Sequence, residues 1–154
     1  MNKASKIVTK IPMYKPEKWK QTINAGCYTY VLNLFEDKFY LIGDFIGKRC
    51  KETVSDEKLI EVFIEEISEH FNCEIEEVDS NKQLEKGKLK VYIQRHIHTG
   101  YYHFFRQDSN GFWSHKYPRE LPTKVDSVGE VIENPDEMVD MPFVGWCFEI
   151  SQRN

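Results

Sequence analysis

The sequence YYHFFRQDSNGFWSHK, residues 101–116, places two histidines on either side of a predicted tight turn. We expect a three-residue loop, Ser109–Gly111, in which a type I turn is followed by a left-handed residue that glycine adopts without strain. This register puts His103 and His115 on one face of a β-hairpin as diagonal neighbours. A two-residue Asn-Gly loop would instead move His115 to the opposite face, so the arrangement of the imidazoles depends on the register.

Further antiparallel strands are predicted on both sides of this hairpin. Residues 89–98, LKVYIQRHIH, alternate, and alternation of apolar and polar residues is typical of a strand with one buried face. One predicted face carries Val91, Ile93 and Ile97, and the other carries Tyr92, Gln94, His96 and His98. Residues 143–150, FVGWCFEI, predict a closing strand.

Two helices are predicted before these strands. Residues 55–71 form the stronger one, with Ser55 or Asp56 as the N-cap. Its apolar stripe follows helical spacing: Ile60, Phe63, Ile64, Ile67 and Phe71. In NAGCYTYVLNLF, residues 24–35, Asn24 is a plausible N-cap, and Cys27, Val31 and Leu34 recur on one helical face. Helices followed by antiparallel strands predict the α+β class.

The length and composition indicate one globular domain. A chain of 154 residues with 40% hydrophobic residues can close a single core. Residues 1–20 contain six lysines, together with prolines that oppose helix, and predict an extended basic leader before a single domain at 21–154. The formal net charge of −4 provides no general attraction for nucleic acid, so we expect no nucleic-acid partner.

The four cysteines are scattered and form no Cys-x-x-Cys pair, which favours reduced thiols in a cytoplasm. We find neither an apolar segment typical of a secretory signal nor a run of roughly 20 apolar residues that would span a membrane. No cofactor motif and no metal motif of known spacing is present. The sequence therefore predicts a cytoplasmic protein without a membrane partner, cofactor or metal.

Cys27, His103 and His115 have the chemistry of a cysteine hydrolase triad. A thiol in the first turn of a helix has its pKa lowered by the helix dipole and by nearby N–H groups. A histidine beside it would complete an activated nucleophile, and a further polar group would orient that histidine. The same residues also fit a buried helical cysteine and two half-exposed strand histidines, so the residues alone leave both interpretations open.

Four blocks of the sequence resemble a group of mostly uncharacterised bacterial and phage-associated proteins. The blocks are GCYTYVLN (26–33), YYHFFRQDSNGFWSHK (101–116), KVDSVGEVI (124–132) and FVGWCFEI (143–150). They cover about a third of the chain, and the hairpin block is the most specific. Two positions depart from the group's pattern: Gly26 stands where the group has Asn, and Tyr117-Pro118 stands where it tends to have Pro-Gly.

That group is similar, more distantly, to papain-like cysteine hydrolases of the NlpC and CHAP types. The resemblance implies a papain-like fold, with N-terminal helices packed on an antiparallel sheet. It implies that Cys27 is the nucleophile, His103 the base and His115 the orienting residue, acting on a peptide or amide substrate. Candidates for lining the substrate cleft are Tyr28, Tyr30, Tyr102 and Trp113, although aromatic residues at these spacings also form cores.

Two other functions compete with this one. His96 and His98 share a strand face and could hold zinc together with His103 or His115 and a cysteine. Alternatively, the chain is a non-catalytic binding or inhibitory module, phage-borne and aimed at a host protein. The role of Cys27 discriminates the second alternative, because a binding module needs only the volume of that side chain.

Overall fold

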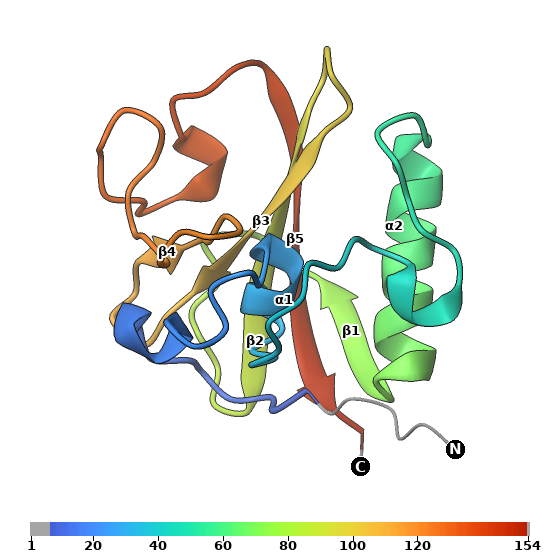
Figure 1. Ribbon diagram of the computed structural model, residues 1–154, viewed down its shortest axis with the longest axis horizontal. Helices are drawn as coiled ribbons and strands as arrows, with labels where there is room; N and C mark the ends of the chain where they lie inside the picture. The colour runs from blue at the N-terminus through green and yellow to red at the C-terminus, as the bar shows by residue number, and fades with distance from the viewer. Residues whose placement is uncertain (1–6, 154) are drawn as a thin grey trace.

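One antiparallel sheet of five strands forms the centre of the computed structural model, which describes residues 7–153 (Figure 1). The strands are β1 (Cys73–Glu77), β2 (Lys88–His96), β3 (Tyr102–Gln107), β4 (Trp113–Ser114) and β5 (Phe143–Gln152). Their order across the sheet is β1-β5-β2-β3-β4, so the last strand of the chain lies between the first two. The predicted antiparallel strands and the closing strand are confirmed.

Short helices precede the sheet and one lies within its connections. The α-helices are α1 (Cys27–Val31) and α2 (Asp56–Glu65), and α2 continues into a π-helical turn, η3 (Glu66–His70). The 3-10 turns are η1 (Pro16–Trp19), η2 (Asp44–Ile46) and η4 (Pro135–Glu137). Helices before antiparallel strands confirm the α+β class.

Both α-helices pack on the same face of the sheet through aromatic side chains. Phe104 of β3 stacks on Tyr28 of α1, with ring centroids 4.9 Å apart, and contacts Phe63 of α2 at 5.5 Å. Phe63 also contacts Phe148 of β5. Burial of these large rings supplies much of the hydrophobic stabilisation on this face, and it fixes α1 beside β3.

The opposite face of the sheet is covered by irregular chain rather than by an α-helix. Tyr92, Phe105, Trp113 and Cys147 form a second buried cluster there, together with Ile132 from the long connection to β5. Figure 1 shows that connection, in orange, looping beside β4. The sheet therefore separates two cores.

Strand β2 follows the predicted alternation over most of its length. Val91 and Ile93 face the core beneath the helices, and Tyr92 faces the second core. Ile97 does not belong to the predicted face, because β2 ends at His96 and Ile97 is 58% exposed in the following turn.

Helix α1 is shorter than the sequence pattern predicts. Asn24 does not cap it, since its backbone N–H and side-chain amide bind the carboxylate of Asp37. The N-cap is Gly26, so the helix begins at Cys27, in agreement with the prediction that this residue lies in the first turn. The left-handed Asn33, with φ of 56°, redirects the chain soon after the helix ends.

Helix α2 has the predicted N-cap but a rotated buried face. The Ser55 side chain accepts a hydrogen bond from the N–H of Lys58, as a helix cap does. Leu59 and Phe63 are buried, whereas Ile64 of the predicted stripe is 38% exposed. Glu66 takes a buried place on this side because backbone N–H groups of another segment bind its carboxylate.

The predicted leader packs on the domain over its described part. Residues 1–6 lie outside the described residues. From Ile7 the chain runs without regular structure to η1, where Trp19 is buried against Tyr30 and stacks on Phe35. Burying a tryptophan stabilises this attachment by a few kcal/mol, so this segment belongs to the folded domain.

Candidate functional site

The hairpin between β3 and β4 has the three-residue loop expected from the sequence. Asp108 N–H donates to Phe112 O at 2.9 Å, and Gly111 N–H donates to Asp108 O at 2.9 Å. Gly111 has φ of +87°, the left-handed conformation that this loop requires at its third position. The register predicted for the hairpin is confirmed.

This register brings the two hairpin histidines into contact. Ladder pairing of Gln107 with Trp113 sets the strands so that His103 and His115 lie on the same face. His103 Nε2 is 2.8 Å from His115 Nδ1, and the two rings meet edge to face. The hydrogen-bonded pair of imidazoles is called the histidine pair below.

The tautomers of the histidine pair follow from one backbone carbonyl. His115 Nε2 lies 2.8 Å from Val125 O, and because a carbonyl only accepts, Nε2 must carry the proton. In a neutral His115, Nδ1 then accepts, so His103 Nε2 is the donor between the rings. A neutral His103 with its proton on Nε2 leaves Nδ1 as an unprotonated base.

Both imidazoles are neutral at physiological pH. Burial lowers the pKa of His103 well below its usual range, and the positive charge that His115 would carry lowers it further. Burial also lowers the pKa of His115, with a smaller opposing effect from the hydrogen bond to Val125 and from nearby Asp126. The neutral forms needed for the tautomer assignment are therefore the stable ones.

Cys27 lies at the edge of β3 beside Phe104, the residue that follows His103. The Phe104 N–H, which belongs to the peptide joining His103 to Phe104, is a hydrogen-bond donor to the Cys27 sulfur. This N–H is free because β4 pairs with β3 only at Arg106 and Gln107. The hairpin thus ends early enough to leave room for the start of α1.

The environment of the Cys27 thiol differs from the one predicted. We expected the helix start to lower its pKa, but burial raises the pKa to about 11, and backbone N–H groups offset burial only in part. With five residues, α1 has a small dipole, and the packed atoms around the sulfur disfavour the thiolate more strongly. The resting group is a neutral thiol, although the residue keeps some exposure to solvent.

Tyr117 contacts the histidine pair and lies within electrostatic range of Cys27. Its ring stacks on His103 with a centroid distance of 4.4 Å, and a negative charge on Cys27 would raise the pKa of its hydroxyl. The ring of Phe39 lies against Gly26, the residue before Cys27, where a Cβ would be 2.5 Å from the ring. The position that carries Asn in the resembling group is thus covered by an aromatic ring here.

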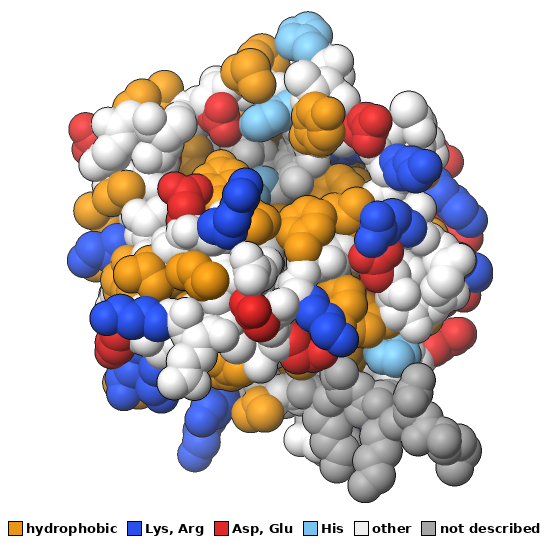
Figure 2. Space-filling model, viewed as in Figure 1, with side chains coloured by type: hydrophobic (Ala, Val, Ile, Leu, Met, Phe, Trp, Pro, Cys, Tyr) orange, Lys and Arg blue, Asp and Glu red, His pale blue; other side chains and the backbone are white. Residues whose placement is uncertain are grey.

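The surface near Cys27 is partly apolar. Phe39, which lies against Gly26, and Tyr117 are each 49% exposed. Figure 2 shows apolar side chains among charged ones across the centre of the displayed face. Tyrosine is one of the residues enriched in the energetically dominant positions of protein interfaces.

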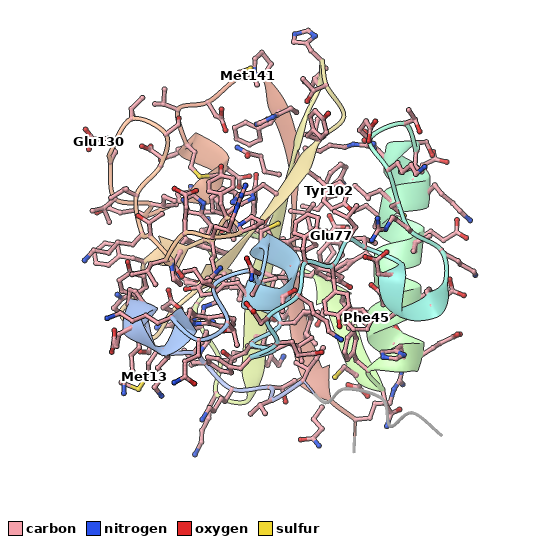
Figure 3. The ribbon with its side chains drawn as sticks, viewed as in Figure 1. Met13, Phe45, Glu77, Tyr102, Glu130 and Met141 are labelled. Carbon is pink, nitrogen blue, oxygen red and sulfur yellow. The ribbon has the colours of Figure 1, made fainter. Side chains whose placement is uncertain are left out.

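Three of the four aromatic cleft candidates are core residues. Tyr28, Tyr30 and Trp113 are at most 1% exposed, so they line no open surface. Tyr102 is partly buried, and its hydroxyl accepts from the Ile42 N–H and donates to Cys50 O, both at 3.0 Å. Figure 3 shows Tyr102 projecting from β3 toward this neighbouring segment. The three tyrosines pack in or against the core beneath the helices, whereas Trp113 belongs to the second buried cluster.

A cavity of about 200 Å³ adjoins the histidine pair. His115, Tyr117 and Phe105 contribute to its wall, together with residues of the connection to β5 such as Val125 and Met138. This volume is about that of one amino-acid side chain, and small-molecule sites are usually larger.

Sequence reasoning missed a buried polar network behind the hairpin. Arg106 and Asp108, 2% and 1% exposed, form an ion pair at 2.8 Å. Asp108 also accepts from the Ser114 hydroxyl, which lies 2.6 Å from the Tyr30 hydroxyl. Arg106 donates in addition to Tyr30 O. The signal was present in the sequence as an arginine and an aspartate two residues apart on the turn side of β3.

A second missed residue is Glu66, which is completely buried beneath α1. Its carboxylate accepts from the Tyr28 hydroxyl and from the N–H groups of Gly43 and Phe45, the latter two at 3.0 and 2.9 Å. These bonds compensate the burial of a carboxylate. They tie Tyr28, the residue after Cys27, to η3, the continuation of α2.

The other histidines form no metal site within residues 7–153. His98 is exposed, and His96 Nε2 lies 3.2 Å from Asp140 Oδ2. No group of three or more potential metal ligands occurs in that part of the chain. Within the same residues, no helix has the length and apolar character needed to cross a membrane.

Comparisons with known proteins identify a relative from a mollusc shell. The chain is 29% identical over 141 residues to insoluble matrix shell protein 1 of Ruditapes philippinarum, covering 86% of each chain. No family model matches, and no solved structure matches. The expectation of a bacterial or phage hydrolase is contradicted by this relative, whose source is neither bacterium nor phage and whose name describes a shell matrix protein.

Proposed function

We propose that this protein is a cysteine peptidase or amidase that catalyses acyl transfer, with Cys27 as the nucleophile and His103 as the base. The observation that carries the proposal is the bond from His115 Nε2 to Val125 O. Through His115, this bond leaves the unprotonated nitrogen of His103 at Nδ1, the ring position not engaged by the histidine pair. Neutral His115 orients the base and accepts its Nε2 proton in a hydrogen bond.

The first chemical step moves one proton and forms one bond. As the Cys27 sulfur attacks the carbonyl carbon of an amide, the thiol proton passes to His103 Nδ1. The resulting oxyanion is stabilised by N–H groups near the sulfur, including that of Cys27. His103 Nδ1 then protonates the leaving amine, and a thioester remains on Cys27.

The second step restores the enzyme. His103 Nδ1, again unprotonated, takes a proton from water as the water oxygen attacks the thioester carbonyl. The tetrahedral intermediate collapses with cleavage of the carbon–sulfur bond, and the proton returns from His103 to the sulfur. The carboxylic acid product leaves, and the neutral thiol and neutral imidazole reappear.

A papain-like arrangement is part of this proposal. It is supported by a helix that begins at Cys27, packs on an antiparallel sheet and meets the strand that carries His103. The twelve-residue interval from His103 to His115 brings the orienting residue, which directly follows β4, beside His103. A cytoplasmic location also belongs to the proposal, since all four cysteines are free.

The test is alkylation of Cys27 by iodoacetamide as a function of pH, read by peptide mass spectrometry. The pKa of His103 is lowered, so this imidazole stays unprotonated even when the pH falls below 6.5, near the usual pKa of histidine. We therefore expect a constant wild-type alkylation rate between pH 8 and pH 6. The rate should fall only when the pH passes through the lowered His103 pKa.

His103→Ala is the matched variant for this measurement. Without the base, the rate should follow ionisation of a thiol whose pKa is raised to about 11, and should fall about tenfold for each pH unit below it. Buried Cys50, Cys73 and Cys147 are internal controls in the same digest. Equal rates and equal pH profiles in the two proteins would refute the assignment of His103 as the base.

A non-catalytic binding module is the second candidate. The raised pKa of the resting thiol favours it, as does the similarity to a protein named as a shell matrix component. Under this alternative, Cys27→Ala would cost only packing, and His103→Ala would leave the reactivity of Cys27 unchanged. The alkylation experiment therefore separates the two candidates.

A further inference from the structure

Lys116 is a completely buried lysine that follows directly after His115. Its ammonium donates to three backbone carbonyls: Ala25 O at 2.5 Å, Ile23 O at 2.7 Å and Tyr117 O at 3.3 Å. A buried ammonium is costly unless its three N–H groups find acceptors, and here each one has a carbonyl.

The three carbonyls belong to two segments that are distant in the sequence. Ile23 and Ala25 lie just before Cys27, whereas Tyr117 lies in the segment that follows β4 and contains His115. Arg119 N–H also donates to Ile23 O at 2.7 Å, so the two segments are joined at a second point. The ammonium is thus a noncovalent cross-link between the start of α1 and the end of the hairpin.

Both chain neighbours of Lys116 contact the same imidazole. His115 forms the hydrogen bond to His103, and Tyr117 stacks on the His103 ring. The residues that fix His103 and the turn that presents Cys27 are therefore held by one side chain.

We propose that Lys116 is a positioning residue that sets the separation of the Cys27 thiol from His103. The proposal rests on the proposed function, because it concerns the geometry of that same site. Displacement of reacting groups by about 1 Å can lower a rate by about a hundredfold. Loss of the cross-link should therefore reduce the His103-dependent reactivity of Cys27.

The chain offers a matched control in Lys90, a second buried lysine, which lies in β2. Lys90 is 1% exposed, and its ammonium donates to Lys82 O and lies 5.8 Å from the Trp113 ring centroid. Neither contact involves the segment before Cys27 or the histidine pair. Lys116→Met and Lys90→Met each remove one buried ammonium, but only the first removes the cross-link.

The experiment measures the pH profile of Cys27 alkylation by iodoacetamide in the full chain, together with the melting temperature of each variant. We expect Lys116→Met to lose the constant rate between pH 8 and pH 6 and to react at least about tenfold more slowly at pH 7. Lys90→Met should keep the wild-type profile despite a lower melting temperature. Adding His103→Ala to Lys116→Met should cause little further loss, since both changes remove the same assistance.

Each other outcome has a defined meaning. A Lys116→Met profile equal to that of Lys90→Met would overturn the positioning role while leaving the proposed function intact. A wild-type rate that does not depend on His103 would refute the proposed function, and the positioning role with it. If Lys116→Met does not fold, Lys116→Gln replaces it, because the shorter amide retains N–H donors and should show an intermediate rate.

Discussion

The side chains on the two faces of the hairpin contact different parts of the protein. His103, Phe105 and His115 point to one side, where they form the histidine pair and part of the second core. Arg106 and Lys116 point to the other side and bind backbone carbonyls of and before α1. The residues of the first side are called the neutral set below, and Arg106, Asp108 and Lys116 are called the charged set. The ribbon that supplies the candidate base therefore also holds the helix that supplies the candidate nucleophile.

The two sets of residues also differ in charge. The histidine pair is neutral because burial lowers both pKa values, and no full charge is needed in its resting state. The other set buries ionisable groups and compensates them, Arg106 with Asp108 and Lys116 with carbonyl dipoles, while burial raises the pKa of Asp108 and lowers the pKa of Lys116. Substitutions in the first set should therefore change chemistry, and substitutions in the second should first change stability.

The largest expected effect is on the charged set. Arg106→Met leaves Asp108 buried without its cation, and removing one partner of a buried ion pair typically costs about 3–5 kcal/mol of the free energy of unfolding. Urea denaturation followed by tryptophan fluorescence would measure this loss. Lys48→Met is the control, since it removes an exposed ion pair with Glu65 and should change stability little.

A small loss in Arg106→Met would mean that Asp108 is satisfied by Ser114 and becomes protonated at little cost. The hydroxyl network, rather than the ion pair, would then hold the hairpin to α1. Asp108→Asn would test that version directly, because it keeps the shape of the side chain and removes the charge.

The sequence predicts the hairpin well because local residues determine it. A glycine in the left-handed position and the short Ser109–Gly111 loop set the register, and the register alone brings His103 beside His115. The Ser55 cap follows from equally local rules. These features need no knowledge of distant parts of the chain.

What the sequence could not predict depends on contacts between distant residues. Glu66 looks like part of a solvated helix face until the N–H groups of Gly43 and Phe45 are placed against it. Trp19 looks like part of a leader until Tyr30 is placed beside it. The raised pKa of Cys27 likewise reflects burial by the whole fold, which outweighs the local effect of a short helix.

An intermediate effect is expected on the neutral set. His115→Leu removes the acceptor for His103 Nε2 and frees the ring to turn, so alkylation of Cys27 at pH 7 should slow by about a hundredfold. His115→Asn retains an oxygen near the position of Nδ1 and should recover most of the rate. The measurement is the labelling rate of Cys27 relative to the wild type.

The informative result is which of these two variants has the faster labelling rate of Cys27. If His115→Asn were as slow as His115→Leu, the bond to Val125 O would matter more than the acceptor, because both variants lack Nε2. If both kept the wild-type rate, His115 would be a packing residue and the histidine pair would have no chemical role.

The smallest expected effect concerns the loop that sets the register of the two faces. Gly111 has φ of +87°, and no atom lies within 4 Å of the position that a Cβ would take, so Gly111→Ala should cost only backbone strain, about 1 kcal/mol. Asn110 is not among the residues with positive φ within 7–153. Asn110→Ala should therefore cost less of the free energy of unfolding, since it loses only the exposed bond from Phe112 N–H.

In a two-residue Asn-Gly turn both positions would have positive φ, and the two variants would be similarly destabilised. Equal losses in urea denaturation would therefore imply the other register in solution, with His115 turned away from His103.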